Sequence, residues 1–327
     1  MAERARSQTI DASGASDGRQ TVMAPFGTTL AALGAERTDV VGLTADLGKY
    51  TDILPFASAF PSRFFNVGMA EQNLIAVAAG LARTGLVPYC TTYAVFATRR
   101  AYDFISIACS HSRLPVRIFA GLPGLSTSYG ATHTAPDDLA LMRAVPDLTV
   151  IDPADATELA LVTRAVVDVD GPVYVRLLRG AVPVVFGSDH RFEIGRACPL
   201  RSGTNIGIIS TGMMTGRTLE AAELLSTKGI SAAVLHMPTL KPFDGDAVLE
   251  LAGRVDRLVT VENHYRAGGL GTAVAETLAD HGVGKRLHRI GLPDRHIECG
   301  AVATLQERYG LTVGRLVDAI SGARVPA

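Results

Sequence analysis

The sequence has few cysteines, no tryptophan and no excess of either charge. Its four cysteines lie far apart and form no CxxC pair, so we predict neither a disulfide scaffold nor a cysteine-rich metal site. Thirty-one Lys and Arg against 32 Asp and Glu leave a net charge of -1, which gives no field that favours nucleic acid or an anionic membrane. We therefore expect neither of these as a partner.

Signals for secretion and membrane insertion are also missing. No apolar run approaches the ~18 residues that a spanning helix needs. The first 20 residues carry no apolar signal segment. We expect a cytoplasmic protein with reduced cysteines.

Several common ligand-binding motifs do not occur. There is no GxxxxGK followed by Ser or Thr, no GxSxG and no HExxH, which argues against a P-loop nucleotide site and against two large classes of hydrolase. The glycine-rich run RAGGLGTAVAE (266–276) lacks the third glycine of a dinucleotide site. A tight strand-to-helix turn is its simpler interpretation.

What the sequence does have is a series of apolar runs that alternate with helical patterns. Hydrophobic residues make up 47% of the 327 residues and charged residues 19%, which suits a compact fold of two domains. The apolar runs predict buried strands at residues 40–43, 87–90, 116–120, 148–151, 173–177, 206–210, 232–236, 257–263 and 286–292. This alternation predicts an α/β protein whose two domains are each a mostly parallel sheet covered by helices.

The predicted organisation has four segments. Residues 1–18 contain mostly Ser, Ala, Gly and charges, so we expect a mobile tail. Residues 183–202 carry prolines, glycines and charges without a clear period, and we interpret them as a linker. The two domains then span residues 19–182 and 203–327.

Glu71 is the acidic residue with the most unusual surroundings. It opens a helix in the run NVGMAEQNLIAVAAGLA, whose other face is almost entirely small and aliphatic, so its carboxyl should be poorly solvated. A buried carboxyl can exchange a proton with a bound base. A first-turn acid that complements the helix dipole would explain the same position, and the residues alone leave both interpretations open.

Four other side chains also have both a functional and a structural interpretation. His133 lies on a loop rich in Gly, Ser and Thr, where it could contact a substrate or stabilise the loop. Arg176 and Arg179 lie at the carboxyl end of the predicted strand VYVRLLR and could bind a phosphate or carboxylate, although surface arginines are common. Phe96 has the helical spacing of a core aromatic.

A resemblance to a known family decides between some of these interpretations. Six segments occur in order: GLTADL (42–47), FFNVGMAEQNLIAVAAGLA (64–82), YAVFATRRAYDFI (93–105), GATHTAPDDLALMRAVPDLTVIDPAD (130–155), PVYVRLLRG (172–180) and TVENHYRAGGLG (260–271). Together they resemble the half of a transketolase that holds the pyrimidine-binding and C-terminal domains. The resemblance implies a pyrimidine-binding domain at residues 19–182 and a transketolase C-terminal-like domain at residues 203–327.

The resemblance further implies an enzyme that uses thiamine diphosphate to transfer a two-carbon ketol unit from a ketose or ketose phosphate to an aldose. In this family an acid at the position of Glu71 bonds N1′ of the cofactor's aminopyrimidine, and an aromatic residue at the position of Phe96 stacks on that ring. By the same resemblance Asp46 lies near the thiazolium and His133 contacts oxygens of the donor sugar. Glu71 and His133 are thus the implied catalytic residues.

Substrate recognition is where the sequence departs from the family. Arg19 and Arg179 fall where family arginines bind the sugar phosphate. Around the histidine the family tends to read Glu-Asp-Gly-x-Thr-His-Gln, whereas here Tyr129 replaces the aspartate. A phenol can neither carry a carboxylate's charge nor fit its volume, so we expect Tyr129 to change how a donor hydroxyl is recognised. A second family histidine, used on phosphate, falls near Gly121 and is also missing.

Half of the family's cofactor site is missing from the sequence. The family binds the diphosphate through a divalent metal at a Gly-Asp-Gly motif, and none occurs in these 327 residues. The resemblance therefore implies a split transketolase, in which an N-terminal partner subunit holds the diphosphate and Mg²⁺ and the complex is α2β2. This chain would supply no metal ligand.

Two alternatives stay open. The β subunit of a 2-oxoacid dehydrogenase uses the same half-fold and glutamate, but the enzyme decarboxylates its substrate. A non-catalytic scaffold or regulatory subunit would keep the fold and lose the chemistry, although a poorly solvated acid at Glu71 argues against that reading.

Overall fold

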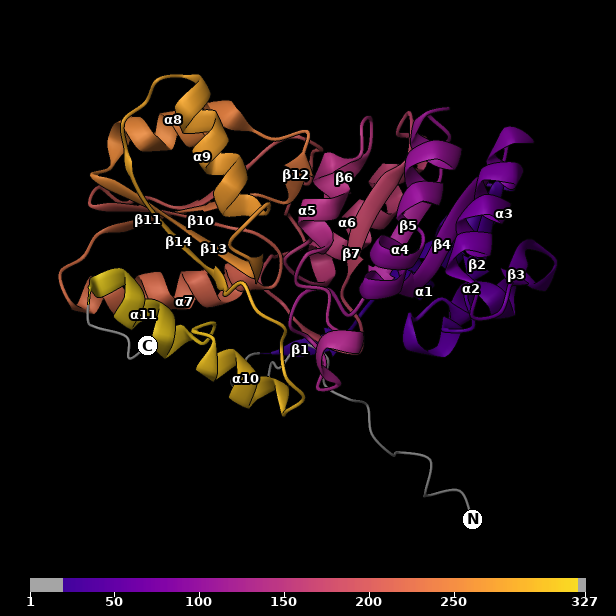
Figure 1. The fold of residues 1–327 in the computed structure, drawn as a ribbon, viewed down its shortest axis with the longest axis horizontal. Helices are drawn as coiled ribbons and strands as arrows, with labels where there is room; N and C mark the ends of the chain where they lie inside the picture. Colours follow the sequence, from indigo (N-terminus) through magenta and orange to yellow (C-terminus); the bar gives the residue numbers. More distant parts are fainter. Residues whose placement is uncertain (1–19, 323–327) are drawn as a thin grey trace, which may run out of the picture.

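Two β-sheets divide the chain into two α/β units that lie side by side (Figure 1). The computed structural model describes residues 20–322, so the expected tail and Arg19 lie outside the described residues. From edge to edge the first sheet contains β12 (Thr239–Lys241), β6 (Thr149–Ile151), β7 (Val173–Leu177), β5 (Arg117–Gly121), β4 (Val87–Tyr93), β2 (Val40–Thr44) and β3 (Phe64–Asn66). The second contains β14 (Arg286–Leu292), β13 (Arg257–Tyr265), β10 (Ile206–Ser210), β11 (Ala232–His236) and β9 (Cys198–Arg201). A separate antiparallel pair joins β1 (Thr21–Met23) to β8 (Ala181–Pro183).

Helices cover both faces of each sheet. The first unit has α1 (Phe26–Glu36), α2 (Leu54–Ala59), α3 (Glu71–Arg83), α4 (Ala94–Arg100), α5 (Asp138–Ala144) and α6 (Ala156–Ala165). The second has α7 (Met214–Thr227), α8 (Gly245–Arg254), α9 (Leu270–Asp280), α10 (Val302–Arg308) and α11 (Val313–Ser321). In Figure 1, α8 and α9 lie on one side of the second sheet and α7 and α11 on the other.

The nine predicted strands are all present, and the predicted α/β class is confirmed. Strands β2, β5, β7, β10 and β11 are buried at every position, because helices cover both faces of a parallel sheet. In the described parts of the two larger sheets, only the edge strands β12 and β9 run antiparallel to their neighbours. Strand β9 lies within the segment interpreted as a linker and pairs with β11.

Two features of the fold have no counterpart in the sequence patterns. Strand β12 belongs to the second half of the chain but pairs with β6 in the first sheet, with Thr239 opposite Ile151. The helical pattern around Ile105 is not one regular helix, because α4 ends at Arg100 and a π-helical segment covers Phe104–Ser110.

Within residues 20–322 every helix is too short or too polar to cross a membrane.

A shared core fixes the two units to each other. One buried cluster joins side chains of the first sheet, such as Ile118 and Val150, to Met237, Leu240 and Leu270 of the second half. Buried polar contacts cross the same boundary. The pairing of β12 with β6, the shared core and these polar contacts together hold the carboxyl ends of the first sheet's strands against the second unit.

Candidate active site

Glu71 is the first residue of α3, and its side chain is buried. The residue is only 3% exposed, because α3 packs Leu74, Ile75 and Ala78 against the first sheet. The predicted poor solvation of this carboxyl is therefore observed. Its position in the first turn also places it at the positive end of the helix dipole, so the two interpretations of the sequence describe the same residue.

A guanidinium group lies against the buried carboxylate. Arg100 Nη1 is 3.3 Å from Glu71 Oε1 and 3.4 Å from Oε2. The central guanidinium carbon of Arg100 also lies 4.1 Å from the centroid of the Phe96 ring, a cation–π contact. The Arg100 side chain is 52% exposed, so its charged group contacts Glu71 and Phe96 on one side and the solvent on the other.

Sequence reasoning missed Arg100. The available signal was its spacing, since Arg100 follows Phe96 by four residues on α4 and therefore lies on the same helical face. The contact with Glu71 had no local signal, because it joins α4 to α3 across 29 positions of the chain.

His133 lies in a cluster of aromatic rings that includes Phe96. Its ring centroid is 5.4 Å from Phe96, 5.3 Å from Tyr129 and 6.3 Å from Tyr93. His133 directly follows the short 3-10 turn Gly130–Thr132, in which Gly130 adopts a φ of +72°. The structure thus brings together three residues singled out from the sequence, Phe96, Tyr129 and His133, and adds Tyr93.

The members of this cluster differ in exposure. Tyr129 is 46% exposed, whereas Tyr93 is buried, and that burial raises the pKa of the Tyr93 hydroxyl above its usual value. Thr132 Oγ1 lies 2.9 Å from His133 Nδ1. A partly exposed histidine and an exposed phenol beside buried rings can reach a bound polar molecule.

Asp46 lies two residues beyond the carboxyl end of β2. It has a φ of 58°, and its backbone N–H and carboxylate both bond the Asn66 side chain at 3.0 and 2.9 Å. Asn66 ends β3 and also accepts from the Gly68 N–H. Asp46 is therefore tied to the loop that leads into α3, rather than to the aromatic cluster.

Arg179 lies after the carboxyl end of β7 and carries a buried nitrogen without a partner. Its Nε atom is buried and makes no hydrogen bond in the described part of the chain, and its guanidinium carbon lies 6.0 Å from the Tyr50 ring. Nearby, burial raises the pKa of Asp52, while the Gly180 N–H and the charge of Arg179 oppose that rise. An orphaned donor of this kind is one that a ligand could satisfy.

Arg176, which had an open functional interpretation, serves the structure. It is 2% exposed and bonds the buried carboxylates of Asp138, at 2.5 Å, and Asp152, at 3.1 Å. Its Nη2 also donates to the Asn263 carbonyl of the second unit at 3.2 Å. The residue therefore links the two units and is closed to substrate.

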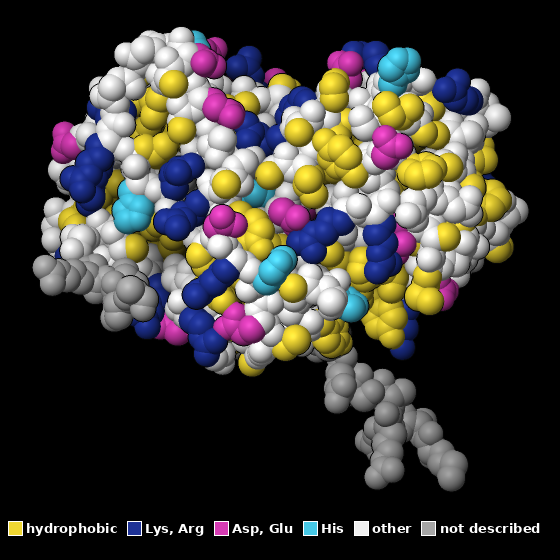
Figure 2. All heavy atoms as spheres, in the orientation of Figure 1, with side chains coloured by type: hydrophobic (Ala, Val, Ile, Leu, Met, Phe, Trp, Pro, Cys, Tyr) yellow, Lys and Arg dark blue, Asp and Glu magenta, His cyan; other side chains and the backbone are white. Residues whose placement is uncertain are grey.

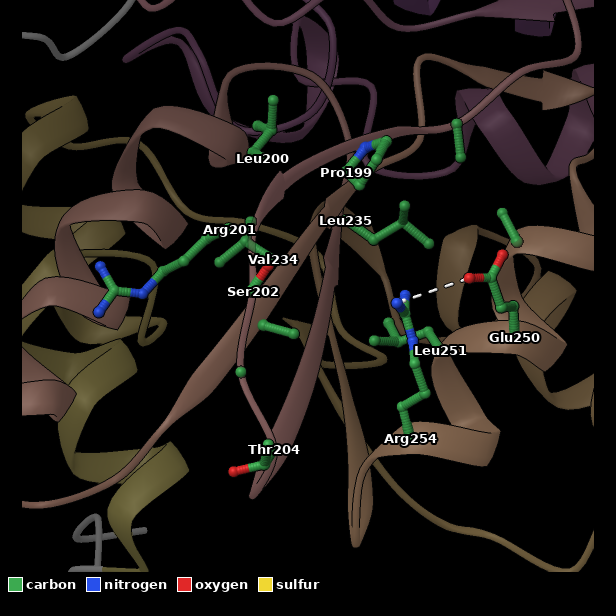
Figure 3. A pocket seen from close by; sticks show the side chains of 14 residues that line it. Pro199, Leu200, Arg201, Ser202, Thr204, Val234, Leu235, Glu250, Leu251 and Arg254 are labelled. Atoms are coloured by element: carbon green, nitrogen blue, oxygen red, sulfur yellow. Dashed lines mark ion pairs between the residues drawn. The ribbon is translucent and has the colours of Figure 1, made fainter.

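A cavity of about 630 Å³ lies elsewhere, between β9, β11 and α8 of the second unit (Figure 3). Its charged side chains include the Glu250–Arg254 pair, 3.5 Å apart, and both members are more than 60% exposed. Exposed pairs of this kind are ordinary surface features. None of the predicted site residues lines this cavity, so we assign no function to it.

Comparison with protein families agrees with this architecture. Residues 19–184 match the family model described as transketolase, pyrimidine binding domain, and residues 195–316 match transketolase, C-terminal domain. The chain belongs to the transketolase family. Membership implies a thiamine diphosphate-dependent enzyme of the transferase type.

Individual relatives cover most of the chain. It is 50% identical over 324 residues to a putative uncharacterized transketolase family protein of Sinorhizobium fredii, covering 98% of this chain and 94% of the relative. It is 38% identical over 287 residues to a 6-deoxy-6-sulfo-D-fructose transketolase subunit of a Clostridium species, covering 87% and 89%. A solved structure described as a split gene transketolase, inactive beta4 tetramer, superposes with a TM-score of 0.83 at 42% identity, covering 91% of this chain and 96% of that one.

The residues at Glu71 fit the cofactor's ring. The Arg100 guanidinium is a planar, nitrogen-bearing group that contacts an aromatic face and bonds a buried carboxylate. An aminopyrimidine also has a flat face and ring nitrogens, although its ring nitrogen accepts a hydrogen bond where the guanidinium donates one. A buried carboxyl group and an aromatic face that one planar group contacts together therefore fit a ring of this kind. Within residues 20–322 no group of three or more His, Cys, Asp or Glu side chains is arranged to bind a metal ion.

Proposed function

We propose that this chain is one subunit of a split transketolase that transfers a two-carbon ketol unit from a ketose or ketose phosphate to an aldose. The observation that supports this most is the buried carboxylate of Glu71, which shares with the Phe96 ring a contact with the half-exposed Arg100 guanidinium. When bound, thiamine diphosphate supplies the nucleophilic carbon and the electron sink for cleavage of the carbon–carbon bond. The residues of this chain would bind and orient the cofactor, and Glu71 would exchange a proton with it.

Glu71 has the central role in the proposal. Its carboxyl group would hold or exchange a proton at N1′ of the pyrimidine, because bulk water is largely excluded from the buried carboxyl and does not compete for that hydrogen bond. Phe96 would supply the flat surface against which the ring rests. Asp46 would lie toward the thiazolium side at the end of β2.

Arg100 must leave its place beside Glu71 and Phe96, the proposed cofactor slot, when the ring enters. Its side chain is half exposed, so the guanidinium can rotate into water at the cost of a partly solvated ion pair, about 1 kcal/mol or less. Arg100 therefore competes only weakly with the cofactor for the position beside Glu71. It does not block the site permanently.

His133 and its neighbours form the proposed substrate side. His133 would hydrogen-bond the donor sugar's oxygens, and Tyr129 stands where the family's aspartate would read a hydroxyl. Arg179 would satisfy its orphaned Nε–H on a substrate anion. Arg19, which lies outside the described residues, is proposed for the same anion.

A second subunit completes the proposal. The solved split transketolase is described as inactive as a β4 tetramer, which supports a need for another chain. In this chain the exposed apolar side chains Phe65, Met69 and Ile107 all lie on the first unit, and Met69, at 80% exposed, precedes Glu71 by two residues. Figure 2 shows hydrophobic side chains over this unit on the face in view. Exposed apolar groups beside a site favour an interface.

We propose that this interface receives an N-terminal subunit that holds the diphosphate and Mg²⁺ in an α2β2 complex. The test is to tag the full chain, recover it with its partner from the native cells, and assay the complex with xylulose 5-phosphate and with pyruvate. Ketol transfer by the complex and none by the chain alone are expected. Turnover of ketoses by the chain alone would contradict the split arrangement, and pyruvate decarboxylation would favour the dehydrogenase alternative.

A further inference from the structure

The loop that carries Tyr129 and His133 is attached to the second unit. We call residues 122–133, which follow β5, the substrate loop. Both backbone polar groups of Leu125 in this loop bond side chains of the second unit. The Leu125 N–H donates to Asn263 Oδ1 at 2.9 Å, and its carbonyl accepts from Gln306 Nε2 at 3.1 Å.

These contacts are fully buried. Leu125 has no exposed surface and packs in the hydrophobic core of the second unit, among residues of α7, β13 and α10. Asn263 is 3% exposed and Gln306 is 1% exposed. Removal of one partner from a buried hydrogen bond leaves the other unsatisfied, which makes such bonds stringent positional restraints.

A second attachment lies beside Tyr129 itself. The Gly300 N–H donates to the Ser128 carbonyl at 3.1 Å, and Cys299 Sγ lies 3.3 Å from the Tyr129 carbonyl oxygen. Gly130 packs against the same segment, since a Cβ atom there would lie 2.7 Å from Cys299 Sγ. The second unit therefore holds the loop on both sides of Tyr129.

The loop's own backbone needs this support. Leu122 and Gly124 adopt φ values of +56° and +59°, a region that non-glycine residues rarely adopt. A Cβ atom on Gly124 would lie 2.2 Å from the Asn263 carbonyl oxygen, so the loop and β13 are in direct backbone contact. On the first unit, Arg99 Nη1 donates to the Ala131 carbonyl at 3.2 Å and anchors the other end.

We infer that the second unit is a positioning device for substrate recognition, and that Asn263 and Gln306 are positioning residues that act on Tyr129 and His133 through Leu125. The inference rests on the proposed function, because it assigns the substrate side of that site. Neither residue touches the proposed cofactor slot at Glu71. Their loss should therefore impair use of the donor sugar and leave thiamine diphosphate binding intact.

The test compares three variants in the recovered complex. Asn263→Ala removes the acceptor for the Leu125 N–H, and Asn263→Asp restores this acceptor but not the Nδ2 donor, which lies 3.5 Å from the Leu125 carbonyl oxygen and 3.2 Å from Met213 Sδ. Val259→Ala is the matched control, because Val259 lies on the same strand and in the same core but does not contact Leu125 through a hydrogen bond. Gln306 is not varied, because it also accepts from Arg217 Nη2 and its change would remove a partner of a buried charge.

For Asn263→Ala we expect kcat/KM for the ketose donor to fall on the order of a hundredfold, as misplaced substrate contacts do. Amide hydrogen exchange should accelerate in residues 122–133. Asn263→Asp should recover most of the loss, and the Kd for thiamine diphosphate should stay within about twofold of the parent in all variants. Val259→Ala should lower the thermal midpoint without changing donor kinetics.

Two results would overturn the inference: donor kinetics and loop exchange equal to those of Val259→Ala, or an equal loss of cofactor affinity. If Asn263→Ala does not fold, Cys299→Ala serves instead, because Cys299 is exposed and its change removes the Sγ contacts with the Tyr129 carbonyl and Gly130 but leaves both Leu125 hydrogen bonds in place. Unchanged exchange and donor kinetics in that variant would count against the inference. The exchange readout is independent of turnover, so a failure of the proposed function, seen as an active Glu71→Gln complex, is distinguishable from a failure of this inference.

Discussion

At the scale of single residues, the site is defined by a buried carboxylate and a cation that competes for it. Glu71 is sheltered by α3 and the first sheet, and its charge is met by Arg100 from α4. Arg100 also covers the face of Phe96. A ligand ring that stacks on Phe96 must displace this guanidinium, so the affinity of the site includes the free energy of breaking that pair.

This competition gives a prediction for Arg100→Ala. In the variant the free protein loses the ion pair while the loaded protein is unchanged, so the Kd for thiamine diphosphate should fall about fivefold, which corresponds to about 1 kcal/mol. Isothermal titration of the complex measures this. Arg83→Ala, at the far end of α3, is the control and should leave the Kd unchanged. Weaker binding by Arg100→Ala would show that Arg100 helps to hold the cofactor.

Tyr129 is the second residue with a distinct prediction. If it takes the place of a carboxylate that reads a donor hydroxyl, Tyr129→Asp should shift the ratio of kcat/KM values toward ordinary ketose phosphates by about tenfold or more. Competing donors assayed with the same complex give this ratio directly. An unchanged ratio would remove Tyr129 from the selectivity of the enzyme.

Much of the site could be predicted at this scale, but not its internal contacts. The landmarks around Glu71, Phe96 and His133 identified residues that the fold then places at the same sheet edge and, for Phe96 and His133, in ring contact. The Glu71–Arg100 pair could not be predicted, because it depends on how two helices pack. Arg176 had the sequence context of a ligand-binding residue, and only its two buried carboxylate partners show that it is structural.

At the scale of elements, the contact between β13 and α5 contains a buried histidine. His264 Nε2 accepts from the Ala140 N–H at 3.2 Å, so Nδ1 carries the proton and donates to the Tyr265 carbonyl at 2.7 Å. Burial, together with the charge of Arg176, lowers the pKa of His264 from 6.5 to about 4. The folded protein therefore needs this ring neutral.

The lowered pKa predicts a dependence of stability on pH. The unfolded chain takes up a proton at His264 near pH 6.5 while the folded chain does so only near pH 4, so this residue's contribution is complete above pH 6.5 and is lost as the pH falls to 4. The free energy of unfolding should fall by about 3 kcal/mol across this window relative to that of His264→Gln. Denaturant titrations of both proteins at several pH values measure the difference.

The comparison with a variant is needed because Glu262 acts in the opposite direction. Burial raises the pKa of Glu262 to about 7, so its proton stabilises the fold as the pH falls from 7 toward 4.5. The parent protein alone would show a partly cancelled slope. Parallel pH curves for parent and variant would contradict the role given to His264.

Elements differed in how far the sequence determined them. Strands such as β7 and β10 could be predicted because most of their five consecutive buried positions carry apolar side chains or glycine. The three-residue strands β1, β3 and β12 are too short to show a period. The π-helical segment at Phe104–Ser110 could not be distinguished from a regular helix, because its apolar spacing over a few residues is the same.

At the scale of the whole molecule, the two units share a core. In our account they have different roles, because one contains the proposed cofactor slot and the other holds the substrate loop. Length and alternating patterns predicted two domains, and both sheets are present. Their junction could not be predicted, because it depends on β12 crossing to the first sheet and on Leu125 entering the second core. The first unit contains the proposed cofactor slot. Through these long-range contacts, the second unit holds the substrate loop beside it.

The central claim is that Glu71 exchanges a proton with the cofactor's pyrimidine inside a complex of two kinds of subunit. Glu71→Gln tests it most directly, because the amide keeps the volume of the side chain and removes the ionisable group. The variant complex should assemble with its partner as the parent does and should lose ketol transfer by about a thousandfold or more, since a positioned acid–base group contributes about 10²–10⁴-fold. Parent-like turnover by an intact Glu71→Gln complex would contradict the account.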